Sequence, residues 1–382
     1  MSLRSILVRC LLVLACLGSA WAQTTPMQPQ WQLSHAPAGV SLETRAAAAG
    51  AAGSLHILGV QRPLAMGKDR TADRGWIGQV LPGGTWGRQT GFVMQPGDVA
   101  VQEIDAFAPL GNGEFAVAGQ AGSGEFWLVA VNELGQARNI RSLGRSRIAF
   151  ILPLANGDLV LGGRVEKDLY AARIRPDGGL AWEQRLDRGR DDLFLAGVLV
   201  DGRLVMLEHS GTREQFFMRE ANVGVTVLQP GDGVPGAPAF AIAGRAGALA
   251  AQPGHYGLVI DAGEGVKQRL LFLQLDAGFK QQAQAELLES SFGLERARLA
   301  AAGAQGWLLA GLDRSALYGL RLDAAGHTVA RFNAGAERVF LHPDAVAGGE
   351  ATYVVATELQ KRDDGRGARS QVFVARFPWG AP

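Results

Sequence analysis

Cysteine is almost absent from this chain. Only Cys10 and Cys16 occur among its 382 residues, and both lie in the first apolar stretch. Beyond that stretch neither a disulfide nor a thiolate metal site can form. Histidine is scarce as well, and its six residues show no His-x-x-x-His or His-Glu-x-x-His spacing. The sequence therefore predicts no metal and no cofactor.

The chain also lacks an excess of charge of either sign. Its 37 basic and 36 acidic residues leave a formal net charge of +1, which gives no reason to expect a nucleic acid as partner. No run outside the N-terminal stretch is long and apolar enough for a transmembrane helix. No Gly-x-Ser-x-Gly elbow, P-loop or dinucleotide fingerprint occurs. We expect a monomer without a recognisable catalytic motif.

The first 22 residues have the pattern of an export signal. Arg4 and Arg9 precede an apolar run over residues 10–18, and Ala20-Trp21-Ala22 offers a small-residue cleavage site. This pattern predicts a signal peptide over residues 1–22, cleaved after Ala22, and a periplasmic or secreted product formed by residues 23–382 as one domain. In an alternative interpretation, residues 13–16 (Val-Leu-Ala-Cys) are a lipoprotein box that leaves Cys16 lipidated.

What the chain does contain is a repeated strand–turn–strand unit. Residues 109–119 (PLGNGEFAVAG) align without a gap with residues 153–163 (PLANGDLVLGG). Asn-Gly between apolar runs is a strong hairpin signal. The same outline recurs around Gly53, Gly202, Gly306 and Gly349, and once more near either Gly247 or Gly254. An apolar third strand follows each hairpin, at residues 75–80, 125–132, 168–174, 215–218, 270–276, 317–323 and 372–377.

A fourth, more polar strand follows most of these units, and four strands per repeat is the signature of a propeller blade. The sequence thus predicts an all-β, seven-bladed β-propeller of four-stranded antiparallel blades. The last repeat ends at its third strand, so we expect residues 30–34 to close the ring as the outer strand of blade seven. Residues 280–290 are interpreted as an outer strand rather than a short helix. Four tryptophans in repeat strands are predicted to pack between blades: Trp76, Trp127, Trp182 and Trp307.

Blades two and three carry the motifs Gly-Glu-Phe-Trp-Leu-Val (residues 124–129), Asn-Glu-Leu-Gly (132–135) and Pro-Asp-Gly-Gly-Leu-Ala-Trp (176–182). They resemble the repeats of bacterial secreted or periplasmic β-propeller proteins, most clearly over residues 100–190. Residues 218–222 of blade four depart from the Asp-x-x-Gly turn of these repeats. The resemblance implies a propeller fold and export but no single activity, because propellers host binders and enzymes alike.

Charged residues open most of the predicted innermost strands. Examples are Glu43 with Arg45, Glu103 with Asp105, and Arg145 with Arg147. We predict a polar binding site at one mouth of the central channel, with contacts from Asp105, Arg147, Asp192, Arg296 and Arg338. In the alternative interpretation these charges are solvated strand ends that pair with their neighbours. The long connections at residues 61–74 and 359–370 are expected to form a lip beside this mouth.

Three functions fit these features. The first is a non-catalytic binding module for a protein, peptide or glycan of the cell envelope. The second is a glycan-cleaving enzyme that uses Asp105 with Asp191 or Asp192, which needs carboxylates about 5–10 Å apart in an open cleft. Arginine neutralising each acid favours binding or a structural role instead. The third is an envelope assembly scaffold, which requires a large exposed apolar patch.

Overall fold

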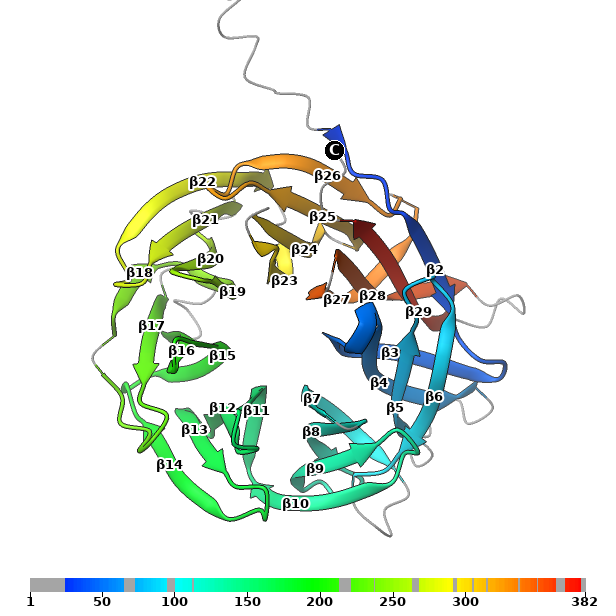
Figure 1. Cartoon of the computed structure of the whole chain (residues 1–382), viewed down its shortest axis with the longest axis horizontal. Helices are drawn as coiled ribbons and strands as arrows, with labels where there is room; N and C mark the ends of the chain where they lie inside the picture. The colour runs from blue at the N-terminus through cyan, green and yellow to red at the C-terminus, as the bar shows by residue number, and fades with distance from the viewer. Residues whose placement is uncertain are drawn as a thin grey trace, which may run out of the picture.

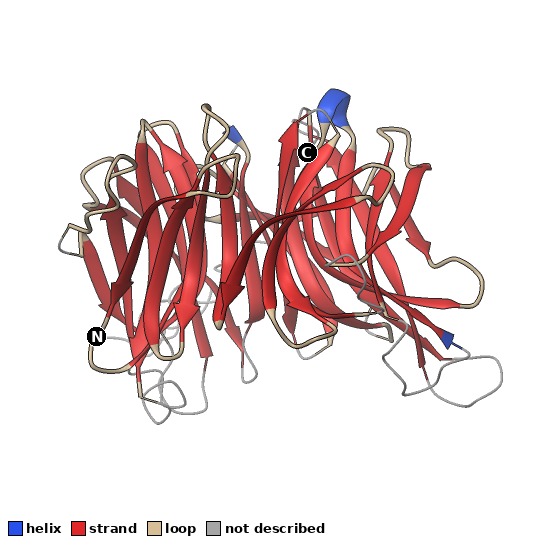
Figure 2. Cartoon of the chain, turned by 90° about the horizontal axis from the view of Figure 1, so that it is seen from below, coloured by secondary structure: helices blue, strands red, loops and turns tan. Residues whose placement is uncertain are grey.

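The protein forms seven small antiparallel sheets arranged around a central axis (Figure 1). The computed structural model describes residues 25–64, 73–94, 100–111, 113–212, 221–236, 238–262, 268–290, 294–303, 306–313, 315–335, 337–348, 350–361 and 368–378. Seen from the side, the strands run between the two faces of the ring (Figure 2). The predicted seven-bladed propeller is therefore confirmed.

Blade one contains β3 (Val40–Ala49), β4 (Leu55–Pro63), β5 (Arg74–Val80) and β6 (Trp86–Phe92), with the 3-10 turn η1 (Ala51–Gly53) in its first hairpin. Blade two contains β7 (Val101–Gly111), β8 (Glu114–Ala121), β9 (Phe126–Asn132) and β10 (Ala137–Gly144). Blade three contains β11 (Ser146–Pro153), β12 (Leu159–Val165), β13 (Asp168–Ile174) and β14 (Leu180–Leu186).

Blade four contains β15 (Asp191–Val200), β16 (Arg203–Gly211), β17 (Asn222–Leu228) and β18 (Phe240–Ala243). Blade five contains β19 (Arg245–Gln252), β20 (His255–Asp261), β21 (Gln268–Asp276) and β22 (Gln281–Ser290). Blade six contains β23 (Leu294–Ala301), β24 (Trp307–Asp313), β25 (Ala316–Leu322), β26 (Thr328–Asn333) and β1 (Thr25–Pro26). Blade seven contains β27 (Val339–Gly348), β28 (Ala351–Lys361), β29 (Ala368–Pro378) and β2 (Trp31–His35).

The core lies between neighbouring blades. The second and third strands of each blade are largely apolar because both of their faces are covered, whereas an outer strand such as β14 alternates buried and more exposed residues. Trp76 and Trp307 are fully buried, Trp182 is nearly so, and Trp127 packs partly buried against the core of blades one and two. The prediction that these four tryptophans pack between blades is confirmed.

The N-terminal strand closes the ring as predicted. β2 pairs antiparallel with β29, which places Trp31 opposite Arg376 at the outer edge of blade seven (Figure 1). The Trp31 ring lies so close to Gly84 of blade one that a Cβ there would come within 2.8 Å of it. Its indole N–H donates a hydrogen bond to the carbonyl oxygen of Pro82 at 3.0 Å.

Blades three and four are joined by the same contact, in which a tryptophan ring packs on a glycine and its indole N–H bonds to a proline carbonyl group; we name it the tryptophan clasp. The Trp182 ring of blade three lies against Gly233 of blade four, and its indole N–H donates to the carbonyl oxygen of Pro230 at 3.0 Å. Both glycines have a positive φ, which turns their backbone under the ring at little steric cost. The closure is therefore an ordinary blade junction made with a strand from the N-terminus.

Three details differ from the sequence prediction or complete it. The first hairpin of blade five turns at Gly254, whereas Gly247 lies within β19. The third strand of blade four is β17, and the predicted residues 215–218 lie outside the described residues. Residues 281–290 form a strand, as predicted. In addition, the short strand β1, which was not predicted, pairs in parallel with β26.

Candidate binding site at the propeller axis

Each of the seven innermost strands carries a β-bulge at an equivalent place in its ladder. The unpaired residues are Arg45, Asp105, Ala149, Leu195 and Gly247 in blades one to five, then Arg296 with Ala297 in blade six and His342 with Pro343 in blade seven. Bulges re-aim side chains and are common beside functional sites. Arg45 of blade one, Asp105 of blade two and His342 of blade seven are polar or charged, whereas the residues inserted by blades three to five are small or apolar.

Glycine on the neighbouring strand accommodates three of these bulges. A Cβ on Gly59, Gly119 or Gly163 would lie 2.0–2.3 Å from the carbonyl oxygen of the residue two places before the bulge. Any side chain there would push the inner strand away. The glycines shared by the repeats therefore mark, in the sequence, where the inner strands bulge.

Arg147 joins blade two to blade three. One of its guanidinium nitrogens lies 2.5 Å from a Glu103 oxygen and 3.2 Å from Oδ1 of Asp105. Burial raises the pKa of Asp105 to about 6, although the positive charge of Arg147 opposes the shift. The Oδ2 atom of Asp105 is buried and has no hydrogen-bond partner within the described ranges. Asp105 can therefore either donate or accept a hydrogen bond near neutral pH.

Arg45 joins blade one to blade seven. It bonds to Glu43 at 3.0 Å and to the Nε2 atom of His342 at 2.9 Å. A second arginine, Arg62, bonds to the other Glu43 oxygen at 3.0 Å. His342 has a φ of +50°, a left-handed conformation that is strained for a residue with a side chain. The bulge holds this imidazole against Arg45.

These side chains form one group, which we name the axial charge cluster: Glu43, Arg45, Glu103, Asp105, Arg147 and His342. It extends over blades seven, one, two and three, because the positive charge of Arg45 also acts on Asp105. Of the predicted contacts, Asp105 and Arg147 lie in this cluster. His342 is not among the predicted contacts, because its position depends on a two-residue bulge in β27.

Asp192 leaves the predicted contact set, because it is only 2% exposed. Its Oδ2 atom accepts the backbone N–H of Arg188 at 2.9 Å, and burial together with the nearby charge of Glu208 raises its pKa. Blade four also differs from four other blades at a nearby place in the sheet. In four other blades a glycine of the second strand faces an aromatic residue of the third, as Gly119 faces Trp127. Blade four has Glu208 facing Gly224 instead, so a polar group occupies this place.

Arg338 also has a structural role. Its guanidinium group lies 4.8 Å from the ring centre of Phe373 and bonds to Glu358 at 2.7 Å. Glu358 also accepts hydrogen bonds from Ser34 of the closing strand and from Gln371. Burial opposes ionisation of Glu358, but these hydrogen bonds lower its pKa below the ordinary value. Arg338 therefore ties β2 to blade seven through Glu358 and Ser34.

The remaining predicted features are described only in part. Arg296 lies in β23, but its side chain is outside the described set. Residues 65–72 and 362–367 of the two predicted lip connections are outside it as well. The described end of the second connection contacts blade one, since the hydroxyl groups of Ser370 and of Ser41 in β3 lie 2.6 Å apart and Arg369 donates to the carbonyl oxygen of Pro37 at 2.8 Å. The second connection thus ends beside β3, and Ser41 of this strand pairs in the ladder with Arg62 of the first connection.

Within the residues that the structure describes, no three His, Cys, Asp or Glu side chains gather as metal ligands would. Nor does any helix there have the length and apolar character of a membrane span.

Comparison with known proteins identifies the fold. No family model and no curated protein matches the chain. A protein of unknown function from Dyadobacter fermentans is 11% identical, with a TM-score of 0.55, over 92% of this chain and 99% of its own. The WD40 domain of Toxoplasma gondii coronin is 10% identical, with a TM-score of 0.56, over 93% and 89% of the two chains. The polysaccharide lyase Uly1 is 10% identical, with a TM-score of 0.52, over 94% of each chain. Because identity is so low, these likenesses show the propeller fold alone.

Proposed function

We propose that the protein is an exported, non-catalytic binding module that takes a protein, peptide or glycan ligand of the cell envelope at the axial charge cluster. One observation carries this proposal: Glu103 and Asp105 are both bound by the single guanidinium group of Arg147. A glycan-cleaving pair needs one carboxyl group to donate a proton and another to act as base or nucleophile across the scissile bond. Carboxylates neutralised by arginine favour recognition over such catalysis.

The chemistry of the cluster also supports a polar ligand of low net charge. Arg45 and Arg147 offer N–H donors, while Glu43, Glu103 and Asp105 offer acceptors beside them. Peptide backbones and sugar rings present donors and acceptors at similar spacing. The small or apolar bulge residues of blades three to five leave the opposite side of the axis suited to a less polar part of the ligand.

The test compares two neighbouring arginines. Arg147 is held in the cluster, whereas Arg145 is 85% exposed and pairs only loosely with Glu166 at 3.4 Å among the described residues. Purified protein is screened against envelope-derived glycans and peptides, and each hit is measured by calorimetry on the wild type, Arg147→Ala and Arg145→Ala. We expect Arg147→Ala to weaken binding at least about tenfold and Arg145→Ala to change it less than about twofold. Equal effects would remove the cluster as the binding site.

A second function has one specific observation in its favour. A carboxyl group with a pKa near 6, such as Asp105, suits a general acid. Under this alternative the protein cleaves glycans, and Asp105→Asn abolishes turnover while leaving ligand binding intact. Measurable turnover on a glycan panel that is lost in this variant would replace the binding proposal.

Export is part of the same proposal. The basic, apolar and small-residue segments of residues 1–22 support cleavage after Ala22 and release into the periplasm or medium. N-terminal sequencing of protein from the source cells should begin at Gln23. A lipidated N-terminal Cys16 would show instead that the protein is membrane-anchored.

A further inference from the structure

Glu103, Asp105 and Arg147 of the axial charge cluster carry charges that do not balance. The two carboxyl groups share one guanidinium nitrogen, which lies 2.5 Å from Glu103 and 3.2 Å from Oδ1 of Asp105. Burial raises the pKa of Asp105 to about 6, so its carboxyl group is mostly ionised at about pH 7.5. Two negative charges then face one positive charge, and one negative charge is in excess.

The surrounding residues do not supply the missing positive charge. Arg45 pairs with Glu43 at 3.0 Å, and Arg62 pairs with the second Glu43 oxygen and with Asp73, each at 3.0 Å. These two arginines and two acids balance each other. The Nε2 atom of His342 lies 2.9 Å from an Arg45 nitrogen and must accept the hydrogen bond, because a guanidinium group only donates. The imidazole ring is therefore uncharged in this contact.

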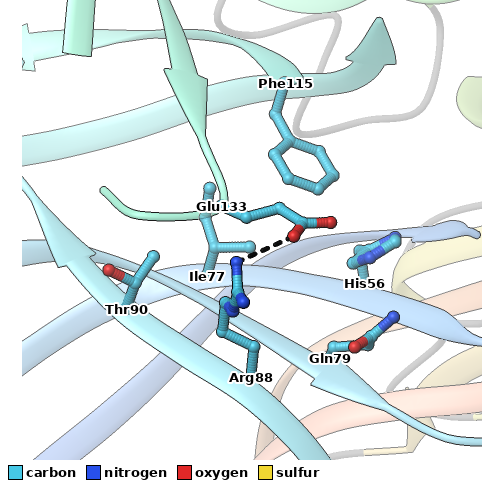
Figure 3. A pocket seen from close by; sticks show the side chains of 7 residues that line it. All are labelled: His56, Ile77, Gln79, Arg88, Thr90, Phe115 and Glu133. Carbon is cyan, nitrogen blue, oxygen red and sulfur yellow. Dashed lines mark hydrogen bonds and ion pairs between the residues drawn. The ribbon is translucent and has the colours of Figure 1, made fainter. Parts of the chain in front are cut away.

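The hollow between blades one and two shows the balanced case. Glu133 there pairs with a single arginine, Arg88, at 2.9 Å (Figure 3). The Phe115 ring of its wall is only 3% exposed, so a ligand finds little apolar surface to pack on. His56 also lines this hollow, at a place in the β-ladders where blade six has Leu308. Neither charge nor shape thus favours a ligand in the hollow.

Solvent, by contrast, reaches the unbalanced group at the axis. The side chains of Glu103 and Arg147 are each 41% exposed. Arg147 bonds to one oxygen of Glu103, and the other oxygen accepts no hydrogen bond from any residue that the structure describes. An ammonium group offers three N–H donors and one positive charge. It can therefore bond to this oxygen and neutralise the excess charge at the same time.

The other side of the axis indicates which ammonium group fits. The bulges of blades three to five insert Ala149, Leu195 and Gly247, none of which has a polar side chain. The methylene stem of a lysine suits such a surface, whereas the hydroxyl groups of an amino sugar would lack partners there. We propose that the axial charge cluster binds a lysine side chain of a peptide or protein ligand, with its ammonium group on Glu103 beside Asp105. This proposal rests on the binding role proposed above.

The test uses two compounds that differ in one group. Nα-acetyl-lysine methylamide carries the amine, and Nα-acetyl-norleucine methylamide has the same straight carbon chain without it. Both are titrated by NMR into the whole purified protein at about pH 7.5 and low ionic strength, where charges are least screened. We expect the lysine compound to bind with roughly millimolar affinity, and the norleucine compound at least about tenfold more weakly, because it lacks the charged donor.

Variants assign the binding to the two carboxylates. Glu103→Gln and Asp105→Asn should each weaken binding of the lysine compound at least about fivefold. Glu166→Gln is the matched control, because it removes an acid that is 69% exposed and pairs with Arg145 outside the cluster; it should change binding less than about twofold. Arg147→Ala should still weaken binding, because two carboxylates without their arginine repel each other and one takes up a proton.

Four results would overturn the proposal. The first is no binding of the lysine compound at about 50 mM, and the second is equal affinity for the two compounds. The third is equal effects of Glu103→Gln and Glu166→Gln in variants that retain the wild-type unfolding temperature. The fourth is tighter binding of methyl glucosaminide, which would identify an amino sugar instead. Envelope ligands that bind the wild type but not Arg147→Ala would, in each case, leave the binding role intact and remove only the lysine.

Discussion

Asp105 lies where burial and a neighbouring cation act in opposite directions. Burial raises the pKa of its carboxyl group to about 6, although Arg147 at 3.2 Å favours the charged form. In the unfolded chain the same group has an ordinary pKa of about 3.9. Between these two values the folded protein binds the proton more tightly than the unfolded chain does, so stability must fall as the proton leaves.

We therefore expect the free energy of unfolding of the wild type, relative to Asp105→Asn, to decrease as pH rises from about 4 to about 7. The raised pKa favours the folded state fully below the unfolded value, and this advantage is lost above the folded value. Two pKa units correspond to at most about 3 kcal/mol. Urea unfolding at several pH values measures the difference. Parallel curves for the two proteins would mean that Asp105 titrates as it does in a peptide.

His56 lowers the stability of the folded protein relative to an apolar side chain at the same place. Its Nδ1 atom is buried and unbonded in the described structure, whereas Leu308 fills the equivalent place in blade six. We expect His56→Leu to raise the free energy of unfolding by about 1 kcal/mol, because a buried unsatisfied polar atom is removed. The reverse change, Leu308→His, should lower it by roughly 2 kcal/mol or more. Thermal and urea unfolding measure both, and a loss of stability in His56→Leu would contradict this account.

The residues of the site were predictable only where the repeats define the start of an inner strand and side-chain alternation along that strand gives the face on which a residue lies. Asp105 and Arg147 lie within inner strands whose start the repeats define. Asp191 and Asp192 are adjacent acids on opposite faces of β15, and side-chain alternation does not say which of them is buried. Arg338 lies just before β27, so the side-chain alternation of a strand does not predict its direction. Its place beside Glu358 follows from packing between distant segments.

At the scale of the elements, most strands were predictable because hairpin turns and apolar runs recur in the repeats. Blade four is the exception, since residues 218–222 lack the repeated turn and the third strand follows later, as β17. The two residues of β1 could not be predicted, because a strand that short has no periodicity. The inner-strand bulges were also missed, although the glycines opposite them were visible in the aligned repeats.

The bulge of β7 gives a prediction for a whole element. A Cβ on Gly119 would lie 2.3 Å from the carbonyl oxygen of Glu103, so Gly119→Ala must push β7 away from β8. We expect a loss of about 2–4 kcal/mol in the free energy of unfolding, together with weaker ligand binding, because Asp105 moves with the bulge.

Gly83→Ala is the matched control for that change. A Cβ on Gly83 meets no atom within 4 Å, and this residue has no positive φ. Its replacement should alter stability by less than about 0.5 kcal/mol. Urea unfolding of both variants measures the contrast. Equal stability of the two variants would show that the bulge adapts to a methyl group.

At the scale of the whole molecule, the ring depends on a strand that comes from the other end of the chain. Trp31 and Trp182 make the same contact with a neighbouring blade, yet they hold different kinds of strand. β14, which carries Trp182, continues directly from β13 in the same blade. β2 reaches blade seven from the N-terminus, and beyond its ladder with β29 it is held by side-chain contacts, among them those of Trp31, the bond from Ser34 to Glu358 and the bond between His35 and Gln89.

Removal of the Trp31 side chain should therefore loosen only blade seven, whereas removal of the Trp182 side chain should destabilise the whole protein. We expect Trp31→Ala to free β2 and to speed amide hydrogen exchange in residues 372–376, which pair with it, while the other blades remain protected. Trp182→Ala removes a more deeply buried ring, so it should lower the free energy of unfolding of the whole protein by about 3 kcal/mol. Hydrogen exchange read by mass spectrometry distinguishes the two. Faster exchange in every blade of Trp31→Ala would mean that the ring opens as one cooperative unit and that the N-terminal strand stabilises all of its blades.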